Sequence, residues 1–246
     1  MYQVGVRPSY STGFAQWPGM SEYPELWRGL VGAWDPSLGQ TGNRLIDLSG
    51  NGYHLAAGAS SPTWVGGKLG TATRYSAASD QYFSGDHSPI KVQGSWSVGC
   101  WVKAGEDNPA DYRDVFYFGD GDTSSNVYLY IAFLSTGQIA VEDRSIGVDV
   151  TTAADYADGN WHYVFVNAIG SLDVTLNVYV DGVYVGTDFT SNDSLVHTFT
   201  RVAIGMLRDS SPGWPFEGDI GSVVLYNRDL LTSEIALHHQ LRKRMA

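Results

Sequence analysis

A single cysteine, Cys100, leaves the 246-residue sequence without any disulfide between its own residues. A chain of this length buries enough apolar surface to fold without such a link. Cys100 alternates with Trp96, Val98 and Val102, so we expect it to be a small buried hydrophobe. The cysteine content leaves the cellular compartment open.

Long hydrophobic stretches are also missing. No run approaches the roughly eighteen apolar residues that span a bilayer, so we expect no membrane insertion. The opening residues, MYQVGVRPSYSTGF, lack the apolar core and the basic start of a secretory leader. Unless a leader has been removed, we expect a chain that is made in the cytosol and does not use the usual export route.

Positive charge is scarce. The sequence has 15 Lys and Arg against 26 Asp and Glu, a net charge of −11 and a pI of about 4.8. Such a field repels phosphate backbones, which argues against nucleic acid as a partner. Most of the acid is aspartate, a residue that favours turns and is also a common ligand of calcium.

Signatures of catalysis are absent too. There is no G-x-S-x-G elbow, no zinc-type spacing of Cys or His, and no glycine-rich phosphate loop before a helix. His238 and His239 are adjacent, so on a helix they point about 100° apart and do not form an i,i+4 ligand pair. We therefore expect a protein that is not an enzyme.

Strand patterns are what the sequence has instead. Residues 95–103 alternate polar and apolar, and Val174, Leu176, Val178 and Val180 share one face of another strand. Asp181-Gly182 then predicts a two-residue hairpin turn, because glycine tolerates the positive φ that the turn requires. Further strands are expected at 31–34, 115–118, 127–133, 139–141, 161–169, 183–185, 202–204 and 220–226.

Both ends differ from this pattern. Residues 232–245 predict one short helix with Leu237, Leu241 and Met245 on one stripe, Thr232 or Ser233 as the cap, and Glu234 in the first turn. Residues 1–29 carry prolines and aromatics without a period, which indicates an irregular arm. Two interpretations of this arm stay open: it packs on its own domain, or it docks on another subunit or partner protein.

Six segments, in order, resemble the laminin G-like, concanavalin A-like jelly-roll family. They are DLSGNGYH at 47–54, GKLGTA at 67–72 with DQY at 80–82, SVGCWVK at 97–103, DGNWH at 158–162, YVDG at 179–182, and IG at 204–205 with FEGDI at 216–220 and LYNR at 225–228. The resemblance covers about residues 30–240. It implies an all-β, two-sheet antiparallel jelly-roll sandwich over 30–246 with one short C-terminal helix.

The resemblance also suggests where ligands would bind. Some related sandwiches carry a structural calcium where their first and last strands run side by side, and the resemblance makes Asp47, Asn51 and Asp219 the candidates for it here. Asx-turn and solvated roles are the alternative. Glycan binding needs exposed aromatics and planar polar groups in loops. The candidates are Tyr112, Arg113, Asp120, Asp122, Arg208, Asp209 and Trp214, with Trp214 packed under its own loop as the alternative.

Three functions stay open. The first is a non-catalytic virion decoration or fibre protein, docked through its arm to other virion or surface proteins, with a lectin-like sandwich for surface glycans. The motivation is an extracellular-type fold without a leader, an aromatic arm and a short basic C-terminus. The alternative is a cell-surface or secreted carbohydrate-binding or adhesion module. The second alternative is a glycoside hydrolase or lyase, although the E-x-D-x-x-E strand common in such enzymes is absent. Either of the first two could form a homo-oligomer.

Overall fold

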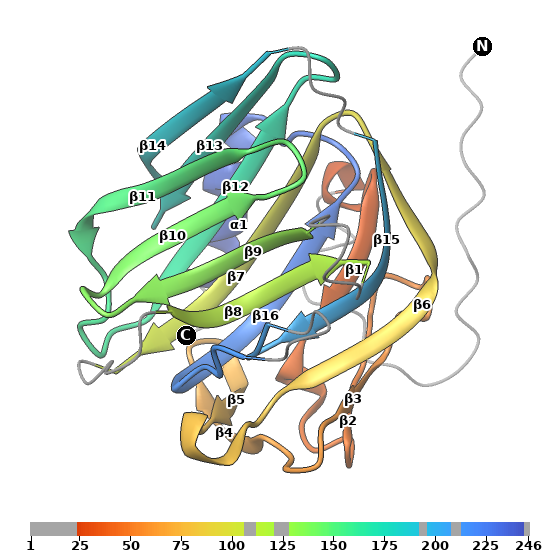
Figure 1. The fold of residues 1–246 in the computed structure, drawn as a ribbon. Coiled ribbons are helices and arrows are strands. Elements are labelled where there is room, and N and C mark those ends of the chain that lie inside the picture. The colour runs from red at the N-terminus through yellow and green to blue at the C-terminus, as the bar shows by residue number, and fades with distance from the viewer. Residues whose placement is uncertain (1–23, 106–111, 121–127, 192–195, 208–212, 244–246) are drawn as a thin grey trace.

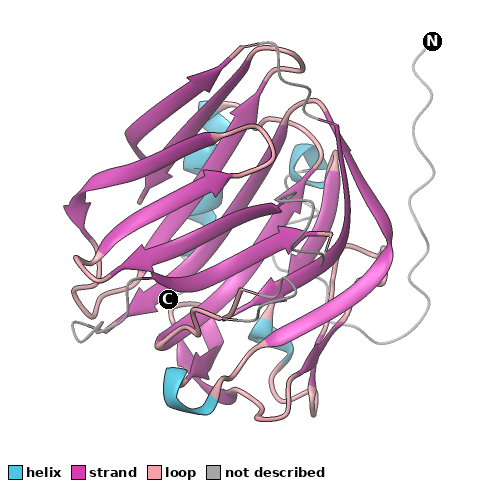
Figure 2. Ribbon diagram, in the orientation of Figure 1, coloured by secondary structure: helices cyan, strands magenta, loops and turns pink. Residues whose placement is uncertain are grey.

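The computed structural model describes residues 24–105, 112–120, 128–191, 196–207 and 213–243. Within these residues, sixteen strands form two antiparallel sheets that lie face to face, with one α-helix behind one of them (Figures 1 and 2). The expected all-β sandwich with a short C-terminal helix is confirmed. None of the described helices is long and apolar enough to span a membrane.

The first sheet, sheet A, has β16 near its centre. Its order is β14 (Val183–Thr190), β13 (Val174–Val180), β12 (His162–Ile169), β7 (Trp96–Ala104), β16 (Gly218–Tyr226), β5 (Gly70–Tyr75) and β4 (Thr63–Gly67), and β1 (Leu30–Trp34) also pairs with β16.

The second sheet, sheet B, runs in the order β11 (Val148–Asp155), β10 (Gln138–Asp143), β9 (Tyr128–Leu134), β8 (Tyr112–Gly119), β15 (Val196–Ile204), β6 (Phe83–Gln93), β3 (Leu55–Ala57) and β2 (Arg44–Leu45). Short 3-10 turns lie at η1 (Pro24–Trp27), η2 (Pro36–Leu38) and η3 (Ala77–Ser79).

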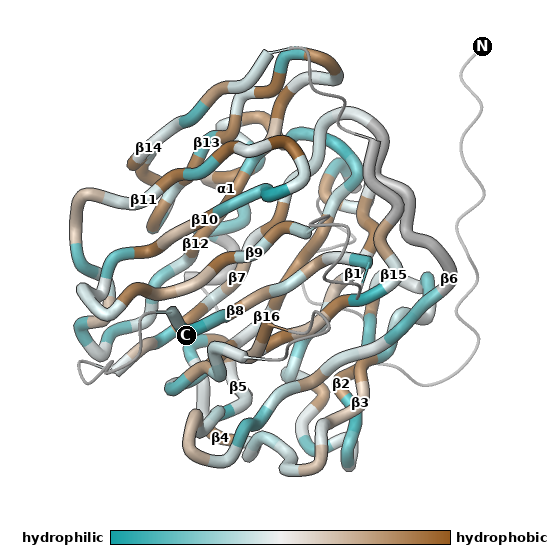
Figure 3. The backbone as a smooth tube through the Cα atoms, in the orientation of Figure 1, coloured by the Kyte–Doolittle hydropathy of each residue, from teal (hydrophilic) through white to brown (hydrophobic). Residues whose placement is uncertain are grey.

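The core lies between the two sheets and follows from period-two alternation. On β7, Trp96, Val98, Cys100 and Val102 all face inward, as the sequence predicts, and they meet Phe116, Phe118, Ile131 and Phe133 from sheet B. Brown segments mark the hydrophobic residues along the strands of both sheets in Figure 3. Burial raises the pKa of the Cys100 thiol to about 12, so the only cysteine is an inert core side chain.

The predicted hairpin turn is confirmed. Val180 pairs with Val183, and the turn residues Asp181 and Gly182 have φ of 53° and 79°. Two consecutive positive φ angles match the right-handed twist of the flanking strands.

Helix α1 (Thr232–Lys243) packs on the outer face of sheet A, and its described buried positions are Glu234, Ile235 and His238. Of the predicted stripe, Leu237 is half-buried and lines a surface cavity, while the Leu241 side chain and Met245 lie outside what the structure describes. The start also differs, because the Glu234 carboxylate reaches back to accept from the Leu231 N–H at 2.8 Å. This contact supplies the reciprocal half of a capping box, so neither Thr232 nor Ser233 is needed as the cap.

The end of the predicted arm belongs to the sandwich. Leu26 is buried, its carbonyl accepts from the Tyr226 hydroxyl at 3.0 Å, and the Arg228 guanidinium donates to the carbonyls of Glu25 and Arg28. Residues 24–29 therefore pack on their own domain. Residues 1–23, which carry most of the predicted arm, lie outside the described residues.

Candidate functional site

Aromatic side chains gather on the outer face of sheet B. Because Phe116 and Phe118 point into the core, their neighbour Tyr117 points outward, and Tyr128 and Tyr130 do the same on β9. We call this group the outer aromatic cluster. Its members are Tyr112, Tyr117, Tyr128, Tyr130, Ala132, Ala203, Leu207 and Trp214.

Trp214 and Tyr112 form the half-buried rim of this cluster. Their rings stack with centroids 4.6 Å apart and planes 25° apart, while Tyr130 meets the Trp214 ring edge-on at 5.8 Å. Backbone bonds fix the segment, since the Trp214 carbonyl accepts from the Asp114 N–H at 2.8 Å, and Leu207 and Gly213 form a bridge. The structure thus brings together Tyr112 and Trp214, two residues singled out in the sequence.

Trp214 has a strained backbone, with a φ of 55°. A positive φ costs a non-glycine residue on the order of 1–2 kcal/mol, and such strain gathers at functional sites. Glycine would adopt this backbone conformation at a lower conformational cost than tryptophan does.

The other predicted ligand residues are placed differently. Arg113 is buried, and its guanidinium donates to the Pro215 carbonyl at 3.2 Å, so it supports the Trp214 segment rather than facing solvent. Asp120 directly follows β8, and its carbonyl accepts from the Thr200 hydroxyl. Asp122, Arg208 and Asp209 lie outside the described residues.

Glu142 is a residue of this face that the sequence analysis did not single out as a ligand-binding candidate. It is in register with Tyr130 across β9 and β10, and the Tyr130 hydroxyl donates to its Oε2 at 2.5 Å. Arg144 donates to Oε1 at 3.3 Å. Burial, and then the bond to Glu142, raise the pKa of Tyr130, so its hydroxyl keeps its proton. A partly exposed carboxylate therefore lies beside the aromatic rim.

The three candidate calcium ligands all have protein partners. Both oxygens of Asp47 accept two bonds each, from the N–H groups of Ala33, Ser49 and Tyr53 and from the Ser49 hydroxyl. The Asn51 amide donates to the Val31 carbonyl, and Asp219 forms a bidentate ion pair with Arg74.

These contacts are those of an Asx turn and an ion pair, so the groups do not form a ready shell for an ion. The described residues contain no cluster of three or more His, Cys, Asp or Glu that could hold a metal. Calcium binding at Asp47, Asn51 and Asp219 stays a prediction: it would raise the melting temperature of the wild type on addition of calcium, but not that of Asp219→Asn.

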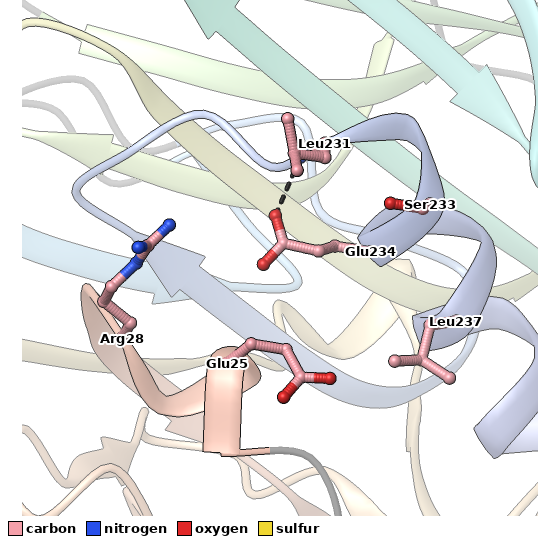
Figure 4. Close-up of a pocket in the computed structure, with 6 residues that line it drawn as sticks. All are labelled: Glu25, Arg28, Leu231, Ser233, Glu234 and Leu237. Atoms are coloured by element: carbon pink, nitrogen blue, oxygen red, sulfur yellow. Dashed lines mark hydrogen bonds between the residues drawn. The ribbon is translucent and has the colours of Figure 1, made fainter.

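A separate cavity of about 610 Å³ opens between η1 and α1 (Figure 4). It is lined by Glu25, Arg28, Leu231, Ser233, Glu234 and Leu237. Glu234 is occupied by Arg228 and by the Leu231 N–H. The lining has no aromatic ring on which a sugar could stack, so the outer aromatic cluster is the better candidate site.

Two antiparallel sheets packed around one core define an all-β sandwich. The chain belongs to the concanavalin A-like lectin/glucanases superfamily, whose laminin G-type model matches residues 76–236, more than half of the sequence. A comparison with curated proteins finds no match.

Solved structures of several binding domains share the fold. Domain 4 of AbnA, an extracellular arabinanase from Geobacillus stearothermophilus solved with arabinotriose, is 19% identical with a TM-score of 0.57, covering 84% of this chain and 96% of that domain. The binding domain of Paraclostridial Mosquitocidal Protein 1 is 13% identical with a TM-score of 0.61, covering 86% of this chain. A Ruminococcus gnavus sialidase module, CBM40, bound to α2,3-sialyllactose, is 13% identical with a TM-score of 0.52, covering 60% of this chain and 84% of that one.

Identities this low show the fold alone. The chain spans 52% of the length of the Paraclostridial domain, but nearly all of the AbnA domain. The fold thus resembles that of carbohydrate- and receptor-binding domains, while the superfamily also includes enzymes by its name. None of these likenesses supports the virion role expected from the sequence.

Proposed function

We propose that this protein is a non-catalytic carbohydrate-binding module that acts outside the cell and holds a glycan at the outer aromatic cluster. The observation that carries the proposal is the rim itself: two stacked rings, Tyr112 and Trp214, beside the Glu142 carboxylate.

The chemistry of the rim suits a sugar. Aromatic faces pack against the C–H faces of sugar rings, and a carboxylate accepts hydrogen bonds from sugar hydroxyls. Tyr130 and Arg144 hold Glu142 from two sides, so little conformational freedom is lost when a ligand binds. Support also comes from the AbnA domain and the CBM40 module, whose structures contain arabinotriose and sialyllactose.

A glycan array followed by calorimetry on the best ligand tests the proposal. Trp214→Ala should weaken binding by about 10- to 100-fold, because removing a stacking aromatic costs on the order of 1–3 kcal/mol. Tyr184→Ala is the matched control, since Tyr184 is an exposed aromatic on β14 of the other sheet, 51% exposed. Binding that survives Trp214→Ala, or an array without any ligand, would overturn the proposal.

The enzymatic alternative makes a different prediction. A hydrolase or lyase would release reducing or unsaturated ends from the glycan that it binds. Incubation of the wild type with each array hit, followed by product analysis, distinguishes a binding module from an enzyme. If the wild type cleaves the glycan and Glu142→Gln does not, the protein is an enzyme and the proposal of a non-catalytic module is wrong.

A further inference from the structure

The charges around the outer aromatic cluster are uneven. Three described arginines lie around the cluster, on β8, on the turn after β10 and on β15, and each has a protein partner. Arg144 pairs with Glu142 at 3.3 Å, Arg201 pairs with Asp86 at 2.5 Å, and Arg113, only 7% exposed, donates to the Pro215 carbonyl. An anionic ligand at the cluster would therefore have to share each of these three guanidinium groups with a carboxylate or carbonyl of the protein.

Two acidic side chains, by contrast, lie beside the rim that Tyr112 and Trp214 form. The Glu142 side chain is 22% exposed, and the exposed Asp149 lies next to it in register on β11. Two carboxylates, those of Glu142 and Asp149, therefore lie beside the rim, against the partly exposed guanidinium of Arg144.

We infer that the site selects neutral glycans and rejects glycans that carry a carboxylate, such as sialylated or uronic-acid sugars. The inference rests on the proposed function and names its ligand class. A sugar carboxylate needs a cation or several N–H donors in its site. Here it would meet Glu142, which accepts hydrogen bonds from hydroxyls but repels another carboxylate.

Matched pairs of glycans test the selection directly. Lactose is compared with α2,3-sialyllactose, and xylo-oligosaccharides are compared with the same chains carrying glucuronic acid. At low ionic strength each neutral member should bind on the order of tenfold more tightly than its acidic partner. The ratio should shrink in 0.5 M salt, because salt screens the repulsion between exposed charges.

A charge-neutral variant sharpens the test. Glu142→Gln keeps the shape of the side chain, removes its charge and leaves Arg144 without its acid, so the preference for the neutral member should fall at least threefold. Glu25→Gln is the control, because Glu25 is an exposed acid on η1, beside α1 on the other side of the molecule.

The outcomes separate the two ideas. If acidic glycans bind as well as or better than their neutral partners, the selection is wrong and the carbohydrate-binding module stands. If no member of any pair binds, and the array is empty as well, the proposed function itself fails.

Discussion

The two outer faces of the sandwich carry aromatic residues on the same alternating pattern, yet their surroundings differ. On sheet A, Trp101, Tyr163 and Tyr226 are sealed by α1 and form a second small core. On sheet B the cluster ends in the half-buried pair Tyr112 and Trp214, and the single α-helix of the described residues lies on the opposite side (Figure 1). Alternation alone therefore does not separate a covered aromatic face from a candidate binding face, whereas the position of one helix does.

Trp101→Ala should break the covered face and give the largest loss of stability. Trp101 is 2% exposed and packs against Tyr163 at 5.2 Å, so truncation leaves a cavity and costs about 3–5 kcal/mol of unfolding free energy. Chemical denaturation measures the loss. The glycan affinity of the remaining folded fraction should be unchanged, and a loss of affinity would mean that the two faces are not independent.

Glu234→Gln should weaken the attachment of α1, the helix that covers the outer face of sheet A. Glu234 pairs with Arg228 at 2.7 Å, with the two side chains 9% and 14% exposed, and the expected cost is about 1–3 kcal/mol. The bond from Arg228 lowers the pKa of Glu234. The stability that this pair adds is therefore present above the unfolded pKa and disappears as the pH falls through the folded one. Wild type and variant should converge in acid, and a gap that persists at pH 2 would contradict the assignment.

Trp214→Ala should reduce glycan affinity more than stability, whereas Trp101→Ala should reduce stability and leave glycan affinity unchanged. Its ring is half-buried, so truncation should cost only about 1 kcal/mol of stability, near the value of one aromatic pair. Its main effect should be the loss of glycan affinity. A destabilisation as large as that of Trp101→Ala would mean that Trp214 is a core residue and not a sugar platform.

The smallest predicted effect on stability comes from a histidine network at the β13–β14 turn. His162 Nδ1 lies 2.8 Å from Asp181 Oδ2, and its Nε2 lies 3.1 Å from Asp158 Oδ1. His239 of α1 approaches Asp181 at 4.0 Å, and the Tyr156 ring packs edge-on against His162. The hydrogen bond that His162 donates to Asp181 raises the pKa of His162, although burial acts against it. Burial alone would raise the pKa of Asp158. The hydrogen bonds that Asn160 and His162 donate to its carboxylate outweigh burial and lower this pKa to about 2.

The sign of the pH effect follows from the raised pKa of His162. Its contribution to stability is complete below the unfolded pKa, near 6.5, and is lost as the pH rises through the folded one. Melting temperatures between pH 5 and pH 9 should therefore fall more steeply for the wild type than for His162→Gln. Equal slopes would show that the imidazole is not charged in the folded protein.

Much of the fold could be predicted because its determinants are local. The Asp181-Gly182 turn and the alternation of Trp96, Val98, Cys100 and Val102 each depend on a few neighbouring residues, and both predictions are confirmed. The short strands β2, β3 and β4 were not recognised from their periodicity, since few of their residues are buried. Here the resemblance to a family supplied what the pattern lacked, at least for the β4–β5 hairpin.

The candidate site could be predicted only in part, because its contacts are distant in sequence. Tyr112 and Trp214 were chosen as exposed loop aromatics, but their stacking joins the start of β8 to the segment between β15 and β16. The pairing of Tyr130 with Glu142 needed the register of β9 and β10, and the ion pair of Asp219 with Arg74 joins residues 145 positions apart. Alternation at Tyr128 and Tyr130 was the one signal that could have pointed to this face.

The burial of Cys100 also makes the protein convenient to handle. Because the only native thiol is inert in the core, a cysteine introduced at the exposed Gln240 would be the single reactive handle. Gln240 belongs to α1, on the side of the sandwich opposite the outer aromatic cluster. Coupling through that thiol would tether every molecule to a sensor surface in one orientation, with Tyr112 and Trp214 turned toward the solution.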